Sequence, residues 1–192
     1  AFDPVACAWD QPDHDRLVDL FNTLEFQQLR QEYAPARDLS RKDYRSITTS
    51  GDLTELIQRL SQAEFFALDT ETTSQYPMRA ELVGISVSLA ANEAFYVPVG
   101  HSGPNAPGQL PREQVLQSLA PVFTHAGIAK VGQNIKYDWL VLRRSGVELA
   151  GAAFDTMLAS YLINPSRRTH GLDQIALDIL GHHTMTYQEV AG

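Results

Sequence analysis

The spacing of apolar residues along the chain predicts a series of helices and strands. Over residues 13–33, apolar residues recur at spacings of three, four and five, which is typical of an amphipathic helix. The polar, proline-containing segment 35–46 that follows predicts a linker. Further helices are expected over 52–63, 112–123, 134–146, 154–163 and 172–181, and strands over 65–68, 82–90, 93–100 and 128–133.

Several residues mark where these elements begin and end. Thr49 followed by Asp52 predicts a capped start for the helix over 52–63, and Ala91 with Asn92 predicts a hairpin between two strands. Gly146 stands where the C-terminal cap of a helix belongs. A meander of strands, followed by strands that alternate with helices, predicts an α/β fold with a mixed β-sheet flanked by helices.

The composition is that of an ordinary globular protein, with 44% hydrophobic and 20% charged residues in a chain of 192. No apolar stretch approaches the roughly 18 residues that a membrane span needs, and the N-terminus lacks the pattern of a signal peptide. We therefore expect a cytoplasmic protein with no membrane partner. Cys7 is the only cysteine, which excludes an internal disulfide and a cysteine-rich zinc site.

The formal net charge of −8 argues against a protein that binds duplex DNA without sequence preference, because such proteins neutralise phosphates with lysine and arginine. An acidic protein can still process nucleic acid if divalent metal ions or a neighbouring domain meet the phosphates. Charge alone therefore leaves the partner open.

Two carboxylates stand together at the end of the first buried strand. Asp69 and Glu71 are two residues apart, so both side chains should leave the same face of a sheet. They would repel one another unless a cation lies between them, and their hard oxygen atoms suit Mg²⁺. The alternative is that Asp69 caps a turn and Glu71 lies in solvent.

A second acidic element lies near the start of the helix over 134–146. Asn134 and Asp138 are four residues apart and so share a helical face. Asp138 can then point toward the strand carboxylates, while Asn134 and Gln133 can offer amides to a substrate. The alternative for Asp138 is an ordinary solvated helix residue.

Three separated stretches match a known family in order and spacing: FFALDTETTS with LVGISVSLA, then VGQNIKYDWLVLRRSGVEL, then AFDTMLASYLINPSRRTHGLDQIAL. Together they closely resemble the 3′→5′ exonuclease domain of family A DNA polymerases, the DNA polymerase I type, over residues 50–192. The resemblance implies a ribonuclease H-like fold of the DEDD exonuclease kind. It also implies proofreading hydrolysis of a single-stranded DNA 3′ end, which releases nucleoside 5′-monophosphates.

In that family the matching acids bind two divalent metal ions, which implies that Asp69, Glu71 and Asp138 are catalytic metal ligands here. The expected cofactor is Mg²⁺, with Mn²⁺ or Zn²⁺ as alternatives. The resemblance further implies that the terminal nucleotide is held by neighbouring polar residues; these are Thr72, Gln133, Asn134 and Tyr137. Each of them could equally be a core or capping residue. Asp155 is similar to a family position that supports the site from behind.

The family completes its site with a third motif, a tyrosine four residues before an aspartate. After Asp138 no such pair occurs, because Tyr161 is followed four residues later by Pro165 and Tyr187 by Ala191. We therefore expect a site truncated before its last ligand, and weak or no activity from this chain alone.

The resemblance also predicts how the chain is organised. Residues 1–48 resemble a tether and the end of a 5′-nuclease region, and residues 49–192 form the partial exonuclease domain. The expected partners are the single-stranded DNA 3′ end and a polymerase domain of the same parent chain. Two alternatives stay open: a stand-alone exonuclease of the ribonuclease D or Werner type, and a catalytically silent domain that binds single strands.

Overall fold

The computed structural model describes residues 12–24, 26, 29, 33, 43–104, 106–182 and 184. Its backbone divides into two compact units. One combines Ala1–Asp38 with Gly171–Gly192 and contains α1 (His14–Thr23) and α7 (Leu172–Leu180); the other, Leu39–His170, contains a β-sheet and its helices. Among the described residues, no helix has the length and apolar character needed to cross a membrane.

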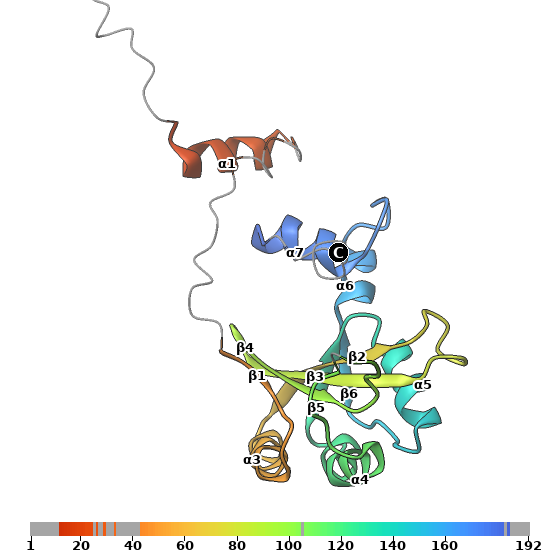
Figure 1. Ribbon diagram of the computed structural model, residues 1–192. Helices are drawn as coiled ribbons and strands as arrows, with labels where there is room; N and C mark the ends of the chain where they lie inside the picture. The colour runs from red at the N-terminus through yellow and green to blue at the C-terminus, as the bar shows by residue number, and fades with distance from the viewer. Residues whose placement is uncertain are drawn as a thin grey trace, which may run out of the picture. The chain divides into compact units, whose positions relative to one another are not determined.

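The larger unit is built on a six-stranded sheet in the order β1-β4-β3-β2-β5-β6 (Figure 1). β3 pairs antiparallel with both β2 and β4, whereas β1 pairs parallel with β4, β5 with β2 and β6 with β5. This arrangement confirms the predicted mixed sheet. The strands are β1 (Asp43–Ser46), β2 (Phe65–Thr72), β3 (Leu82–Ala90), β4 (Glu93–Pro98), β5 (Ala129–Gly132) and β6 (Ala152–Asp155).

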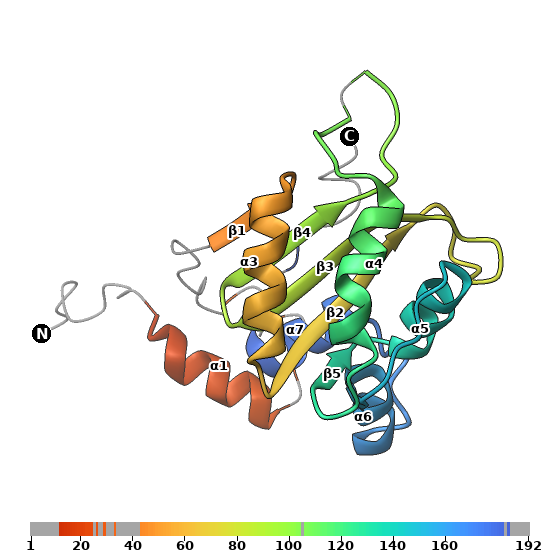
Figure 2. The same cartoon turned by 90° about the horizontal axis from the view of Figure 1, so that it is seen from below.

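Helices pack on this sheet, and α3 and α4 lie side by side on one of its faces (Figure 2). Their buried leucines, valines and phenylalanine meet the inward side chains of the strands in one core, where Phe66 of β2 stacks at a tilt near Phe123 of α4. α5 packs against β2 and α6 against β6. The helices of this unit are α3 (Ser50–Ser61), α4 (Arg112–Phe123), α5 (Ile135–Arg144) and α6 (Thr156–Ile163).

The residues that punctuate the sequence act as predicted. The hydroxyl oxygen of Thr49 accepts a hydrogen bond from the backbone N–H of Asp52 at 3.2 Å, which caps α3. β3 ends at Ala90 and β4 begins at Glu93, so the hairpin has the expected two-residue turn. Asn92 takes the left-handed conformation there, with φ of 63°.

Four sequence predictions need correction or extension. The strand predicted over 65–68 is longer, because β2 continues to Thr72 and includes Asp69 and Glu71. The end of the predicted linker is wrong, because Asp43–Ser46 forms β1. The start of the helix predicted over 154–163 is also wrong, because Phe154 and Asp155 belong to β6 and α6 begins at Thr156. Of the helix predicted over 13–33, α1 covers His14–Thr23. Most of its remainder, Cys7 and much of the predicted tether lie outside the described residues.

Candidate active site

Asp69 and Glu71 lie on the exposed face of β2, close to its C-terminal end. Burial alternates along the strand, so that Phe66, Leu68 and Thr70 face the interior while the residues between them are exposed. The two carboxylates therefore leave the same face, as their spacing predicted.

Asp138 comes from the first turn of α5 and is almost fully buried, with 2% of its surface exposed. Its carboxylate oxygen Oδ1 accepts hydrogen bonds from the backbone N–H of Thr70 at 2.8 Å and from the Thr70 hydroxyl at 2.6 Å. β5 pairs with β2 only over residues 65–67 and does not extend beside Thr70. Asp138 therefore supplies the acceptor for the backbone N–H of Thr70. Asp138 is thus fixed to the residue between the two strand acids.

The three acids influence one another electrostatically. Although Asp69 lies on the exposed face of β2, burial of its carboxylate by the surrounding protein raises its pKa to about 7, and the negative charges of Asp138 and Glu71 add to the rise. Burial also raises the pKa of Asp138 to about 6; the hydrogen bonds from Thr70 lower it, whereas the charge of Asp155 raises it. Burial, reinforced by the like charges nearby, therefore makes full ionisation of Asp69 and Asp138 costly without a cation.

The donor chemistry at this edge fits a hard divalent cation. Asp69 and Glu71 offer carboxylate oxygens from one exposed strand face, the kind of ligand that Mg²⁺ prefers. Within the described ranges, however, no three His, Cys, Asp or Glu side chains gather closely enough to hold one metal ion. The structure brings Asp138 to Thr70 by hydrogen bonds, and its role as a third metal ligand stays a prediction.

Thr72 and Tyr137 meet through their hydroxyl groups. The two hydroxyl oxygens lie 2.5 Å apart, and each is placed to donate to the backbone carbonyl of Ser74, 3.1 Å from the Thr72 hydroxyl. Because each hydroxyl carries one proton, two of these three contacts are hydrogen bonds at any one time. The structure therefore brings together these two predicted substrate contacts, one from β2 and one from α5. Both are partly buried beside the acidic end of the strand.

Gln133 and Asn134 lie in the turn that leads from β5 into α5. The side-chain amide of Gln133 donates to the carbonyl of His170 at 2.8 Å, and its oxygen accepts from the hydroxyl of Thr156. Asn134 is the N-cap residue of α5 and adopts a left-handed φ of 56°. Their predicted contact with a substrate stays a prediction.

Asp155 holds the starts of two helices. Its carboxylate accepts backbone N–H bonds from Met157 and Leu158 at the start of α6, and from Asn134 and Ile135 at the start of α5, all between 2.8 and 3.2 Å. A carboxylate at a helix N-terminus is also favoured by the helix dipole. Asp155 thus has the structural role that was predicted for it, and its support of a catalytic site stays a prediction.

The sequence analysis missed two residues of this region. Thr70 does carry a sequence signal, because strand alternation turns it toward the interior, the side from which Asp138 approaches. Ser74 contributes through its backbone carbonyl, for which the sequence carries no signal.

A tyrosine of β4 lies next to Glu71 on the same sheet. Gly84 of β3 pairs in register with Glu71, and a Cβ at Gly84 would lie 2.1 Å from the hydroxyl oxygen of Tyr96. The tyrosine ring therefore covers this glycine. Burial, with a contribution from the charge of Glu71, raises the pKa of Tyr96. Its hydroxyl shares a 2.6 Å hydrogen bond with Nε2 of His101.

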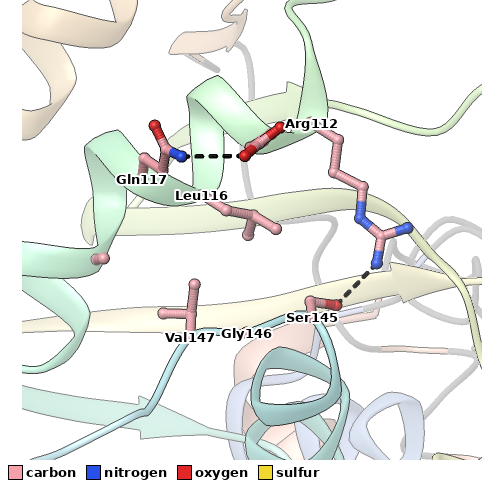
Figure 3. A pocket seen from close by; sticks show the side chains of 8 residues that line it. Arg112, Leu116, Gln117, Ser145, Gly146 and Val147 are labelled. Carbon is pink, nitrogen blue, oxygen red and sulfur yellow. Dashed lines mark hydrogen bonds between the residues drawn. The ribbon is translucent and has the colours of Figure 1, made fainter.

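A cavity of about 530 Å³ lies elsewhere in the same unit, between α4 and the turn that follows α5 (Figure 3). Its lining includes Arg112, whose guanidinium donates to the Ser145 hydroxyl at 3.0 Å, together with Leu116 and Val147. None of the predicted site residues lines it. The cavity is therefore separate from the acidic end of β2.

Comparison with known proteins identifies the family. A family model described as 3′-5′ exonuclease matches residues 44–192. DNA polymerase I of Pseudomonas aeruginosa is 35% identical over 196 residues, which cover 95% of this chain and 22% of that protein. The chain thus spans less than a quarter of the polymerase that it matches.

Two solved structures support the fold. RNase D of Trypanosoma brucei is similar with a TM-score of 0.62 at 19% identity, over 77% of this chain and 50% of that one. NrnC of Brucella melitensis with bound Mg²⁺ gives a TM-score of 0.52 at 19% identity, over 76% of this chain and 64% of that one. These likenesses confirm the predicted fold of DEDD exonucleases. The chain itself belongs to the 3′–5′ exonuclease family and is related to bacterial DNA polymerase I.

Proposed function

We propose that this chain is the proofreading domain of a longer DNA polymerase I-like protein, and that it hydrolyses the 3′-terminal phosphodiester of single-stranded DNA. In this proposal another domain of the same parent chain carries the polymerase activity. Family membership and the 35% identity to a bacterial DNA polymerase I support it. The observation that carries it is the geometry at the end of β2, where Asp69 and Glu71 leave one face of the strand and Asp138 is hydrogen-bonded to Thr70 between them.

The three acids would hold the divalent ions, with Mg²⁺ as the first candidate because one fold relative binds it. Such ions, when bound, supply a nucleophilic water at neutral pH and stabilise the charge on the leaving 3′ oxygen. The protein's own contribution is to fix the ligands. Thr70 holds Asp138, and the sheet holds Asp69 and Glu71 on one face.

The terminal nucleotide would lie beside the adjacent hydroxyls of Thr72 and Tyr137. Both hydroxyls are already oriented by the Ser74 carbonyl, so binding would not have to order them. Gln133 and Asn134 complete the proposed nucleotide site from the turn before α5, whose backbone Asp155 fixes.

The test measures release of 5′-mononucleotides from a labelled single-stranded DNA with Mg²⁺, using the full-length protein that contains this chain. Asp69→Ala should abolish release while leaving DNA synthesis on a primed template intact. Glu64→Ala is the matched control, because Glu64 is an exposed acid just before the same strand. Release that persists in Asp69→Ala would refute the assignment of the site.

The likeness to RNase D makes single-stranded RNA of the same sequence an informative second substrate. Faster release from RNA than from DNA, together with no DNA synthesis, would favour a stand-alone exonuclease. Binding of single strands without any release by the unsubstituted protein would favour a silent scaffold instead.

A further inference from the structure

The loop over residues 73–81 joins β2 to β3 and begins directly after the proposed metal and nucleotide ligands. Two hydrogen bonds between Thr73 and Glu81 close the base of the loop. The backbone N–H of Thr73 donates to the carbonyl of Glu81 at 3.1 Å, and the backbone N–H of Glu81 donates to the Thr73 hydroxyl at 3.0 Å. Within the loop, the carbonyl of Tyr76 accepts from the N–H groups of Arg79 and Ala80 at 2.9 Å. The loop is therefore an ordered turn that runs beside α5 (Figures 1 and 2).

Residues at both ends of helix α5 form hydrogen bonds to this loop. Near the start of the helix, the hydroxyl of Tyr137 donates to the carbonyl of Ser74. At its last residue, Nη1 of Arg144 donates to the carbonyls of Pro77 at 2.9 Å and Ala80 at 2.8 Å. A guanidinium group gives stronger hydrogen bonds than a neutral donor, so Arg144 is the main attachment of the loop's outer part.

The attachment by Arg144 bears on the nucleotide site through a short chain of contacts. Displacement of the loop would move the Ser74 carbonyl, which orients both the Thr72 and the Tyr137 hydroxyls. Arg112 of α4 also reaches the loop, at Glu81, but that ion pair is 3.3 Å long and exposed, so its contribution is small.

We propose that Arg144 is a positioning residue for the 3′-terminal nucleotide, acting through the carbonyls of Pro77 and Ala80 on the loop that orients Thr72 and Tyr137. This inference rests on the proposed function. It assigns to Arg144 an effect on substrate affinity and not on the chemical step, because Arg144 contacts none of the three acids in the described contacts. A residue that sets geometry for binding alters KM, whereas one that acts only in the transition state alters kcat.

The experiment compares Arg144→Gln and Arg144→Lys in the full-length protein, with single-stranded DNA as substrate. Arg144→Gln should raise KM about tenfold and leave kcat within about twofold, as expected for the loss of charged hydrogen bonds to a binding loop. Arg144→Lys should restore most of the affinity, because an ammonium can still reach a carbonyl. Arg143→Gln is the matched control, since the neighbouring Arg143 forms an exposed ion pair with Glu148 and lies over the Trp139 ring.

A double variant and hydrogen exchange separate positioning from mere stability. Arg144→Gln combined with Tyr137→Phe should raise KM by less than the product of the single effects, because both act through one loop. Amides of residues 80 and 81 should exchange faster in Arg144→Gln, while those of the core strands stay protected.

An unchanged KM in Arg144→Gln, or equal loss of protection throughout the sheet, would overturn the positioning role while leaving the proposed exonuclease in place. Should the unsubstituted protein release no nucleotides, the proposed function would fail, and this inference with it. If Arg144→Gln does not fold, the KM of Arg144→Lys decides: a rise that stays below tenfold supports the proposal, and a fall in kcat alone contradicts it.

Discussion

The carboxylate of Asp138 accepts two hydrogen bonds from Thr70, one from its backbone N–H and one from its hydroxyl. These residues are 68 positions apart in sequence, and both are buried. The contact attaches α5 to β2 between the two strand acids. The geometry of the candidate site therefore depends on a residue, Thr70, that is not itself expected to touch metal or substrate.

Thr70→Val should destabilise the protein by about 1–2 kcal/mol, because a buried charged group loses one hydrogen-bond donor while the side chain keeps its shape. Urea unfolding measures the change. Thr54→Val is the control, since the Thr54 hydroxyl bonds only to the Ser50 carbonyl on an exposed helix face and its loss should cost about 0.5 kcal/mol or less. Equal effects of the two substitutions would contradict the importance assigned to Thr70.

Asp69→Asn should stabilise the metal-free protein at pH 8 and much less at pH 5. The folded-state pKa of Asp69, about 7, lies above its ordinary value of 3.8, so its contribution to stability is fully present below pH 4 and is lost as pH rises through 7. An uncharged asparagine avoids that loss. Because Asp69 is exposed on its strand face, solvent screening reduces the expected gain to about 1 kcal/mol.

Urea unfolding with a chelator at pH 5 and pH 8 measures this difference. Glu64→Gln, at an exposed position before the strand, should change little at either pH. A gain from Asp69→Asn of the same size at both values would show that charge repulsion in the site is not its cause.

Asp155→Ala should cost about 2–3 kcal/mol, because four backbone N–H groups at the starts of α5 and α6 lose their acceptor. Asp155→Asn keeps one acceptor oxygen and should cost about half as much. Thermal unfolding compares both with Asp52→Ala, which removes an exposed carboxylate from the first turn of α3. A loss no larger than that of Asp52→Ala would argue against the double cap.

Gly84→Ala should destabilise the protein by about 1–3 kcal/mol, because the new Cβ would lie 2.1 Å from the Tyr96 hydroxyl and force the ring aside. Gly51→Ala is a control of opposite sign, since Gly51 lies in helix α3 and the nearest neighbour of its new Cβ would be the Thr49 hydroxyl at 3.8 Å, an ordinary contact. In a Tyr96→Ala background, Gly84→Ala should cost less than it does in the unsubstituted protein, because the ring that it meets is gone. Full additivity of the two changes would show that they do not meet.

The strands that bear the site could be predicted because their side chains follow a pattern. β3 and α4 have the predicted bounds, since apolar periodicity and turn residues define them locally. β1 could not be predicted, because all four of its side chains are exposed and only backbone pairing with β4 makes it a strand. In the sequence, Phe154 and Asp155 look like the first residues of the helix that follows them. They form a strand because they pair in parallel with β5.

The candidate site was partly predictable for the same reason. Strand alternation places Asp69 and Glu71 on one face, and this follows from a spacing of two alone. The attachment of Asp138 to Thr70 depends on where α5 packs, which a single sequence does not specify. The amide of Gln133 was expected to meet a substrate, and its bonds to Thr156 and His170 likewise arise from the tertiary fold.

β1 forms one border of the sheet, with β4 as its only partner among the described strands. An uncovered border can recruit a strand from another molecule and so begin aggregation. Here the border strand is only four residues long, and a 2.7 Å ion pair between Asp43 and Arg45 places both charges on it. Shortness and charge thus discourage intermolecular β-pairing at this border.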